Sequence, residues 1–329
     1  MPACPLVSVG IPVYNGAASI RGALESVLGQ TYAHIEVVVC DNGSTDGTED
    51  ICRQYAAIDG RVRYIRNERN IGALPNFMRV LELSHGTYFA WNAADDVRPV
   101  EAIAACVSAL ERFPQAVMAH GPVHARLAAP PRTVEVDNRM DLSEASADCR
   151  IRAFTRGLEH NGMLYGLYRR KFLATARLRR HFGHDYLFCL KMCLLGPIAY
   201  TSVPIIGYQH RNDAVVGPMY ARLAPTLKDL LFYRGVRRSK CWTTLFLGCS
   251  YLMAEPSVPM KAKIRATAAH VQGFTSRYAG HLASETVFVL FWPFFRVLGP
   301  FAPLLIRANA ELKRRGLFGG VSKNADSHL

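Results

Sequence analysis

Two adjacent carboxylates, Asp95 and Asp96, stand directly after an apolar run that ends near Trp91. Neighbouring acids repel each other, and a hard divalent cation such as Mg²⁺ or Mn²⁺ relieves that repulsion and can neutralise a diphosphate group. The alternative is that the pair acts as an acidic N-cap for a helix that starts near Val100. The pair is therefore a candidate metal site.

An aromatic ring and an amide follow the first apolar run of the chain. Tyr14 and Asn15 come after Pro12 and Val13, where a proline-restrained turn delivers both side chains to the end of the run. A ring can stack on a nucleic base, and an amide can hydrogen-bond its edge. This pair is a candidate nucleoside contact.

Two further polar loops have similar composition. Asp41 and Asn42 open the small-residue loop 41–47, and the carboxylate of Asp41 can accept a hydrogen bond from a base N–H. A turn followed by a helix cap accounts for much of this loop equally well. The third loop, 67–72, brings together a cation, an amide and a glycine, namely Arg69, Asn70 and Gly72.

Each of these loops lies between a short β-branched run and a segment of helical length. The predicted strands are 6–13, 35–40, 62–66, 87–92 and 116–119, and the predicted helices are 18–28, 46–57, 73–83 and 100–112. This alternation predicts an α/β fold with an open, mostly parallel sheet flanked by helices. In such a sheet a ligand binds outside the carboxyl ends of the strands, which is where the four polar loops begin.

The rest of the chain is predicted in less regular pieces. Residues 120–150 lack a clear period and are expected to form a loop or an edge excursion near an acceptor. They are followed by a predicted helix 151–159, a strand 163–168, a helix 185–195 and strands 198–201 and 205–210. We expect a catalytic domain over 1–212, with a nucleotide-binding half at about 5–119 and an acceptor half at about 120–212. Residues 213–329 are expected to form a helical extension.

The net charge of +13 is concentrated in that extension. Residues 1–200 hold 22 Lys+Arg and 20 Asp+Glu, whereas residues 201–329 hold 17 and 6, so the two parts carry +2 and +11. An anionic membrane surface is the expected partner, because the cations accompany apolar helices such as 242–253 and 285–308. Prolines interrupt 286–306, so an interfacial segment fits better than a complete crossing, and helices buried against the catalytic domain are the alternative. Nucleic acid is not expected, because exposed aromatics are not interleaved with the arginines.

The nine cysteines include no C-x-x-C pair and no histidines at zinc-ligand spacing. They are expected to pack as small core residues in a reducing compartment. The first residues do not have the pattern of a secretory signal peptide. We therefore expect the chain to be cytoplasmic and peripheral on the inner face of the cell membrane.

Several of these segments, in this order and spacing, resemble the family 2 glycosyltransferases, whose nucleotide-binding fold is called GT-A. The segments that carry the resemblance are Pro12-Val13-Tyr14-Asn15, 25–28 with 30–32, 35–39, 41–48, Asn70-Ile71-Gly72 and Ala94-Asp95-Asp96. The resemblance is close over roughly 5–115 and looser over 160–212. It implies an inverting transfer of a sugar from a UDP-, GDP- or dTDP-sugar, with a divalent metal as cofactor.

The resemblance also implies roles for single residues. Pro12, Tyr14 and Asn15 would line the nucleoside pocket, Asp41 would bind the base, and Arg69 with Asn70 would lie beside the nucleotide. Asp95 matches the last aspartate of the family's Asp-x-Asp metal motif, and Asp96 is the acid that commonly follows it. Ala93 replaces the first aspartate of that motif, so the ribose contact and part of the metal affinity depend on other residues, among which Asn92 is a partial substitute.

Two residues of the second half complete the expected site. Asp185 opens a helix at the place where family members carry their catalytic acid, and it is our candidate for the base that takes the acceptor hydroxyl's proton. Its alternative role is that of an acid favoured at a helix N-terminus. His210 stands where some relatives supply a third metal or phosphate contact, and a histidine with a purely structural role is the alternative.

The expected function is transfer of a single sugar to a glycan or polyprenyl-linked acceptor in cell-surface polysaccharide biosynthesis. Processive synthases of the same family carry several membrane spans and a Gln-x-x-Arg-Trp motif, and neither is found in this sequence. The competing interpretations are a nucleotide-sugar-binding pseudoenzyme, which Ala93 favours, and a nucleotidyltransferase of similar fold. A glycine-rich phosphate loop, which a nucleotidyltransferase could carry, is not found in the sequence.

Overall fold

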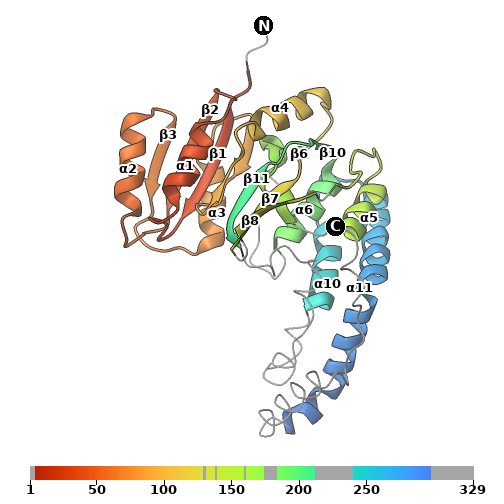
Figure 1. Cartoon of the computed structure of the whole chain (residues 1–329). Coiled ribbons are helices and arrows are strands. Elements are labelled where there is room, and N and C mark those ends of the chain that lie inside the picture. The colour runs from red at the N-terminus through yellow and green to blue at the C-terminus, as the bar shows by residue number, and fades with distance from the viewer. Residues whose placement is uncertain are drawn as a thin grey trace.

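The computed structural model describes residues 4–128, 131–137, 139–158, 161–173, 184–211 and 240–297. Its main sheet has seven strands in the order β10-β6-β9-β4-β1-β2-β3, and only β9 runs antiparallel to its neighbours. The strands are β1 (Val7–Val13), β2 (Ile35–Asp41), β3 (Val62–Arg66), β4 (Tyr88–Trp91), β6 (Met118–His120), β9 (Leu167–Arg169) and β10 (Ile198–Tyr200). The expected α/β fold with an open, mostly parallel sheet is confirmed (Figure 1).

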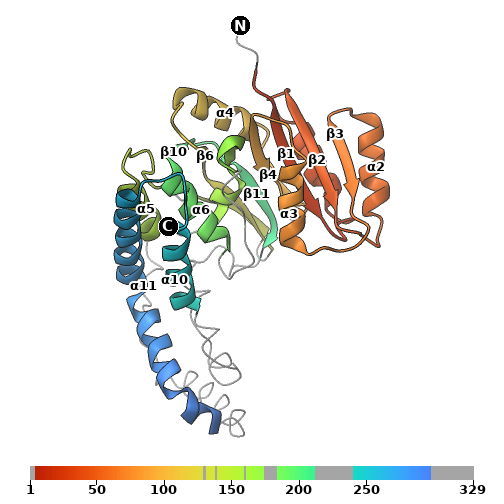
Figure 2. The same ribbon diagram turned by 180° about the vertical axis from the view of Figure 1, so that it is seen from behind.

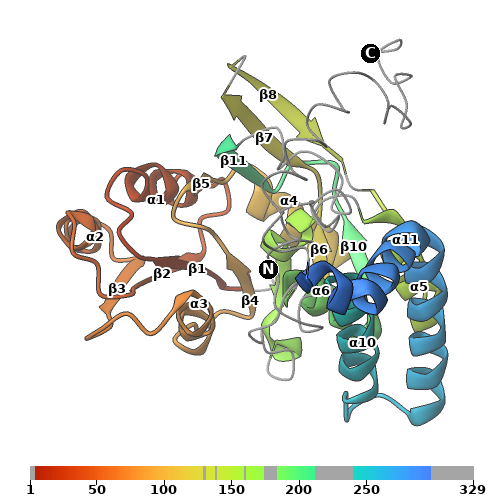
Figure 3. The ribbon, with the colours of Figure 1, turned by 90° about the horizontal axis from the view of Figure 1, so that it is seen from below.

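Helices cover both faces of this sheet. They are α1 (Ile20–Leu28), α2 (Thr48–Ile58), α3 (Ala73–Glu82) and α4 (Ala102–Arg112). Seen from below, α1 and α2 lie on one face of β1–β3, and α3 lies on the other (Figure 3). Covered on both faces, every residue of β1 is buried, as is usual for central parallel strands. In α1 the buried residues are Ile20, Ala23, Leu24 and Val27, the spacing of one apolar helical stripe.

A second sheet of four strands has the order β5-β11-β7-β8. Its strands are β5 (Asp96–Val97), β7 (Val123–Ala128), β8 (Pro131–Val136) and β11 (Ile206–Arg211). Of the two alternatives expected for 120–150, the loop is therefore wrong, because β7 and β8 form an antiparallel pair within it and β8 lies at the edge of the second sheet. In β7, Val123 and Ala125 are buried and Arg126 is exposed. The alternation of apolar and polar residues is too short for β7 to be recognised as a strand from the sequence.

The segment between β8 and β10 packs a small helical layer beside the sheet. It contains α5 (Ala147–Gly157), the 3₁₀ helix η1 (Asn161–Tyr165), a second 3₁₀ helix η2 (Arg170–Phe172) and α6 (His184–Leu195). The strand predicted at 163–168 is wrong in its position, since 161–165 is helical and the strand is Leu167–Arg169. Gly166 separates the two, and a Cβ atom there would lie 2.4 Å from the carbonyl oxygen of Ala119. Only glycine permits that approach of two backbones.

Two C-terminal helices, α10 (Lys240–Met253) and α11 (Met260–Val297), pack beside α5 and α6 (Figures 1 and 2). Leu245 of α10 and Phe274 of α11 belong to the same buried cluster as Trp91 of the main sheet, so the described part of the extension shares the core of the α/β region. Within the described ranges no helix is both long and apolar enough to cross a membrane. The expected interfacial segment 286–306 lies partly in α11 and partly outside the described residues, and the domain boundary at 212/213, also outside them, stays a prediction.

Candidate active site

The strand order places a topological switch point between β1 and β4. The chain starts in the middle of the sheet at β1, moves to one side through β2 and β3, and then returns to the other side at β4. Because these four strands are parallel, their carboxyl ends form one rim, and the crevice at such a switch point is where open α/β sheets bind ligands. The loops after Val13 and Trp91 flank this crevice, and those after β2 and β3 extend the rim.

Side-chain hydrogen bonds hold the loops after β1 and β2 together. Asn15 has a positive φ of 50°, its N–H donates to the Ser44 hydroxyl over 2.9 Å, and its Oδ1 accepts from the Thr45 N–H over 2.9 Å. Tyr14, by contrast, is 48% exposed. A ring held on a rigid loop and open to solvent is suited to stacking on a base.

Pro12 and Val13, which were expected beside the nucleoside, are both buried within β1. Val13 packs in the hydrophobic core between the sheet and its helices. In this structure the two residues direct the loop that follows and do not form its open surface.

The carboxylate of Asp41 lies beneath the second loop and is fully buried. Its Oδ1 accepts hydrogen bonds from the N–H and the hydroxyl of Ser44 over 2.8 and 2.6 Å, and its Oδ2 accepts from the Tyr64 hydroxyl over 2.6 Å. The Arg66 Nε lies 3.6 Å from the same Oδ2. Burial, together with the hydrogen bond to Asp41, raises the pKa of Tyr64, so the phenol remains a donor. Both oxygens of Asp41 are thus engaged inside the protein.

A network of four asparagines ties the second loop to the third. The Asn42 Nδ2 donates to the Asn70 Oδ1 over 2.8 Å, and the Asn42 Oδ1 accepts from the Asn67 Nδ2 over 3.1 Å. Asn67 also donates to Asn76 of α3, whose own amide donates to the Cys40 carbonyl over 2.8 Å. The sequence analysis missed Asn76. It is a polar residue on the buried face of α3, where an apolar residue is expected, and that mismatch was the only sign of its role.

Two glycines allow these loops to approach one another. Gly43 has φ 77°, and a Cβ atom there would lie 3.1 Å from the Arg69 carbonyl carbon. Gly72 precedes α3 with φ 94° and ψ 156°, a conformation that is almost exclusive to glycine. Between them, Arg69 and Asn70 are exposed on the rim, as a contact with a nucleotide requires.

The two candidate metal ligands have different environments. Asp95 is exposed, whereas Asp96 is fully buried and pairs with Tyr208 in the antiparallel ladder between β5 and β11. The Asn92 Nδ2 donates to the carbonyls of Ala93 and Asp96, which closes the loop between β4 and β5. The alternative of an acidic N-cap is contradicted, because α4 begins only at Ala102.

The third expected ligand, His210, lies on β11 two residues beyond Tyr208, and its side chain lies outside the described residues. Among the side chains that the structure does describe, there is no group of three or more His, Cys, Asp or Glu that could hold a metal. Mg²⁺ often takes only one or two protein carboxylates and completes its shell with phosphate oxygens and water. The exposed Asp95 beside Asp96 is compatible with a cation held jointly with a diphosphate.

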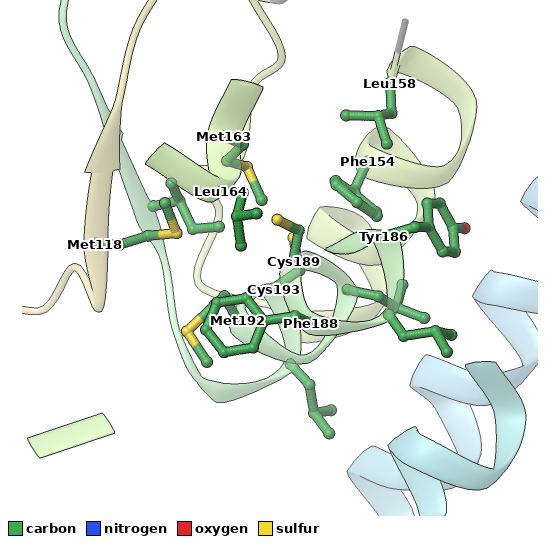
Figure 4. Close-up of a cluster of buried hydrophobic side chains, with 14 of the residues drawn as sticks. Met118, Phe154, Leu158, Met163, Leu164, Tyr186, Phe188, Cys189, Met192 and Cys193 are labelled. Atoms are coloured by element: carbon green, nitrogen blue, oxygen red, sulfur yellow. The ribbon is translucent and has the colours of Figure 1, made fainter. Parts of the chain in front are cut away.

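Asp185 lies in the first turn of α6 and is half-buried. Its Oδ1 accepts a hydrogen bond from the Tyr186 N–H over 2.9 Å, which is also what an acid favoured at a helix N-terminus would do. The next five residues of α6 are all buried, and Figure 4 shows Phe188, Cys189, Met192 and Cys193 surrounded by side chains of α5, β6 and η1. The helix that carries Asp185 is therefore held in place by packing along most of its length.

Aromatic contacts connect that helix to the carboxylate loop. The ring of Phe188 lies 5.5 Å from that of Trp91, the last residue of β4, and both lie 5.6 Å from the ring of Tyr168. Phe188 follows Asp185 by three residues, a rise of about 4.5 Å along a helix. The candidate base Asp185 thus lies about one helical turn from Phe188, and Phe188 packs against Trp91 at the end of the strand that precedes Asp95.

Residues 8–135 match the family model described as glycosyl transferase family 2. TuaG of Bacillus subtilis, a glycosyltransferase assigned to teichuronic acid biosynthesis, is 42% identical over 92 residues, which are 28% of this chain and 36% of TuaG. Chondroitin synthase of Escherichia coli is 32% identical over 181 residues, which are 54% of this chain and 22% of that protein. The aligned part thus spans only about a third or less of these relatives.

The fold is also similar to that of solved structures. S. aureus TarS, residues 1–349, superposes with a TM-score of 0.58 at 17% identity, covering 82% of this chain and 72% of that structure. TarS has been solved in complex with UDP and with UDP-GlcNAc. At this identity the likeness establishes the fold alone.

Proposed function

We propose, from the match of residues 8–135 to the glycosyl transferase family 2 model, that the chain transfers a single sugar from a nucleotide diphosphate sugar to a glycan or lipid-linked acceptor. The observation that carries the proposal is the shared rim of β1 to β4. It brings an exposed tyrosine, an amide network and a carboxylate loop to one switch point.

The donor nucleoside is proposed to lie on the first three loops. Tyr14 stacks on the base, and Arg69 with Asn70 lies beside the phosphates or ribose. We propose that Asp41 acts by holding Ser44 and through it the backbone of Asn15, since both of its oxygens are engaged within the protein. The amide network of Asn42 and the bend at Gly72 hold the third loop in place for this contact.

Asp95, with Asp96 and His210, is proposed to hold a divalent cation, Mg²⁺ or Mn²⁺, together with the donor diphosphate. When bound, the cation would neutralise charge that develops on the leaving nucleoside diphosphate. Two carboxylates on one loop suit a hard cation, and the exposed position of Asp95 leaves room for phosphate oxygens.

Asp185 is proposed to be the general base. Its other carboxylate oxygen, Oδ2, takes the proton of the acceptor hydroxyl as the hydroxyl oxygen attacks the anomeric carbon, and the bond from that carbon to the diphosphate breaks on the opposite side. One displacement inverts the anomeric configuration. The Tyr186 N–H donates to Oδ1 of Asp185, which fixes the plane of the carboxylate and with it the direction of Oδ2.

The names of TuaG and chondroitin synthase support an acceptor that belongs to a polysaccharide pathway. The charge of +11 after residue 200 supports a position on the inner face of the cell membrane, since each Lys or Arg near anionic lipid contributes about 1 kcal/mol. A peripheral enzyme on that surface would meet a polyprenyl-linked acceptor directly.

The proposal is tested by nucleotide binding and by transfer. UDP, GDP and dTDP are screened by thermal shift with and without Mn²⁺, since a ligand at 100 times its Kd adds about 2.7 kcal/mol to the stability of the native state. One nucleotide is expected to raise the melting temperature, and more so with Mn²⁺. The absence of a shift with all three, with and without the metal, would overturn the donor assignment.

Transfer from the corresponding sugar nucleotide is then compared in the wild type and Asp185→Asn. The variant is expected to lose about 10²–10⁴-fold in rate while it binds the nucleotide as before. A second candidate, a pseudoenzyme, is favoured by Ala93 in the metal motif. It predicts nucleotide binding by the wild type with neither transfer nor hydrolysis of any sugar nucleotide.

A further inference from the structure

Arg98 is a buried cation that neither the family resemblance nor the sequence pattern brought out. It follows β5 directly and is 3% exposed. Its guanidinium donates from Nη2 to the carbonyls of Trp91 and Tyr165 over 2.8 and 3.2 Å, and from Nη1 to the carbonyl of Ile205 over 2.9 Å. Its Nε donates to the Asn92 Oδ1 over 3.2 Å.

These four acceptors belong to three separate parts of the fold. Trp91 and Asn92 form the end of β4 and the start of the carboxylate loop. Tyr165 ends η1 in the acceptor half, and Ile205 directly precedes β11, the strand that contains His210. One planar group thus joins the segments of the donor side and the acceptor side near the carboxyl end of β4. A guanidinium has several N–H donors in fixed directions and can bind all of these acceptors, whereas a lysine ammonium cannot.

The arrangement is costly for stability. Burial lowers the pKa of Arg98 to about 10, and none of its described hydrogen-bond partners is a carboxylate. Buried charged groups stabilise a fold little or not at all compared with apolar residues of similar volume, and their best attested use is to specify one arrangement. The position of Arg98 therefore points to a need for a defined geometry between the three segments.

We infer that Arg98 is a positioning residue that sets the carboxylate loop, Asp95 and Asp96, against η1 and β11, so that the donor and the acceptor meet at a fixed distance. This inference rests on the proposed function of the same site. Arg98 reaches no ligand itself, since it is enclosed by the carbonyls it binds. It acts through the loop 92–96. The Asn92 amide donates from Nδ2 to the Asp96 carbonyl within this loop, and its Oδ1 accepts from the Nε of Arg98.

The chain offers a matched control in Arg150, which is also 3% exposed and also bound to carbonyls. Its Nε donates to the Cys193 carbonyl over 2.8 Å, and its Nη1 donates to those of Glu144 and Ala145 over 2.5 and 2.6 Å. Cys193 lies near the end of α6, eight residues from Asp185, and these contacts do not include the donor loops. Either substitution by Met leaves buried carbonyl acceptors without their donor, so Arg98→Met and Arg150→Met should cost similar stability for different functional results.

The experiment uses the full chain and three readouts: the melting temperature, the dissociation constant of Mn²⁺ in the presence of the nucleoside diphosphate by calorimetry, and kcat with KM for both substrates. Arg98→Met is expected to weaken Mn²⁺ binding and to lower kcat, each by about tenfold or more, while the nucleotide alone binds as in the wild type. Arg150→Met is expected to melt at a similarly reduced temperature with both constants unchanged. Arg98→Lys keeps the charge without the fork and is expected to fall between wild type and Arg98→Met.

Equal values of kcat and of the Mn²⁺ constant in Arg98→Met, Arg98→Lys and wild type would overturn the inference, as would equal losses in the Arg98 and Arg150 variants. If Arg98→Met does not fold, Arg98→Lys decides between these outcomes alone. Failure of the proposed function looks different, because the wild type itself would then neither bind a nucleotide nor transfer a sugar.

Discussion

The indole of Trp91 and the ring of Phe188 meet edge to face, with centroids 5.5 Å apart and planes inclined by 81°. Trp91 ends β4, and its Nε1 donates to the Phe77 carbonyl of α3 over 2.9 Å. Phe188 lies one turn beyond Asp185 in α6. This contact sets the helix of the candidate base against the strand that leads into the carboxylate loop.

Replacing Phe188 with Leu should shift that helix. We expect Phe188→Leu to lower the free energy of unfolding by about 1–2 kcal/mol, as partial loss of a core ring does, and to lower kcat several-fold with nucleotide binding unchanged. The measurements are urea unfolding, nucleotide calorimetry and steady-state kinetics. Phe274→Leu in α11 is the control for the Trp91 contact, since Phe274 is equally buried but has its ring contacts with Tyr278, His270 and Tyr186. A normal kcat in Phe188→Leu would show that the Trp91 contact does not set the position of Asp185.

Metal binding should respond in opposite directions to two changes in the carboxylate loop. Ala93→Asp restores the first aspartate of the family motif and is expected to tighten the metal-dependent part of nucleotide affinity several-fold, because it adds a hard oxygen ligand. Asp95→Asn is expected to weaken that part by about tenfold or more and to leave metal-free nucleotide binding intact. Calorimetric titration of the nucleotide with and without Mn²⁺ measures both. A gain in affinity with Mn²⁺ that is as large in Asp95→Asn as in the wild type would remove Asp95 from the metal site.

Gly72 should be intolerant of a side chain. Its φ of 94° with ψ of 156° is strained for every other residue, so Gly72→Ala is expected to cost about 1–3 kcal/mol and to weaken nucleotide binding by moving Asn70. Gly22 is the control because it is a half-buried residue of α1 at which a Cβ atom would meet nothing within 4 Å. Gly22→Ala should stabilise the fold by up to about 1 kcal/mol without an effect on binding. Equal stability of the two variants would contradict the strain at Gly72.

Stability should decline below neutral pH because of buried histidines. Burial lowers the pKa of His270 to about 4, against a smaller opposing effect of its hydrogen bond with the Leu245 backbone, and its ring packs near Tyr186 and Phe274. The unfolded chain takes up this proton below about pH 6.5, whereas the folded chain does so only near pH 4. The contribution of a neutral His270 to the free energy of unfolding is therefore fully present above pH 6.5. Between pH 6.5 and pH 4 it falls by about 1.4 kcal/mol per pH unit, which amounts to about 2 kcal/mol from pH 7 to pH 5.

Urea unfolding of the wild type and His270→Leu at pH 7 and pH 5 measures this effect. His270→Leu should lose less stability between the two pH values, by about 2 kcal/mol. His120 is also buried with a pKa lowered to about 4 by burial, so the wild type should show a further decline that persists in the His270 variant. Parallel losses in wild type and His270→Leu would contradict a neutral His270 in the fold.

The sequence by itself was sufficient for most of the first third of the chain. Val62–Arg66 has the predicted bounds, and the other predicted strands and helices up to Arg112 differ from the structure by at most a few residues, whereas the short strand β5 was not predicted. Local patterns determine these elements: apolar runs buried on both faces for the strands, and one apolar stripe for each helix. Since parallel strands share one rim, the positions of Tyr14, Asp41 and Asp95 at their ends were also within reach of sequence reasoning.

Only the tertiary structure decided how those residues are used. The buried carboxylate of Asp41 accepts a hydrogen bond from Tyr64, 23 positions away in the sequence. The guanidinium of Arg98 donates to the carbonyl of Ile205, 107 positions away. The position of the hairpin β7–β8 is set by the parallel pairing of β7 with β11, which comes about 80 residues later in the chain. Such partners leave no local period or motif, because a carbonyl acceptor has the same chemistry in every residue. The chemistry at the rim could be read from residue types, but its geometry required the folded chain.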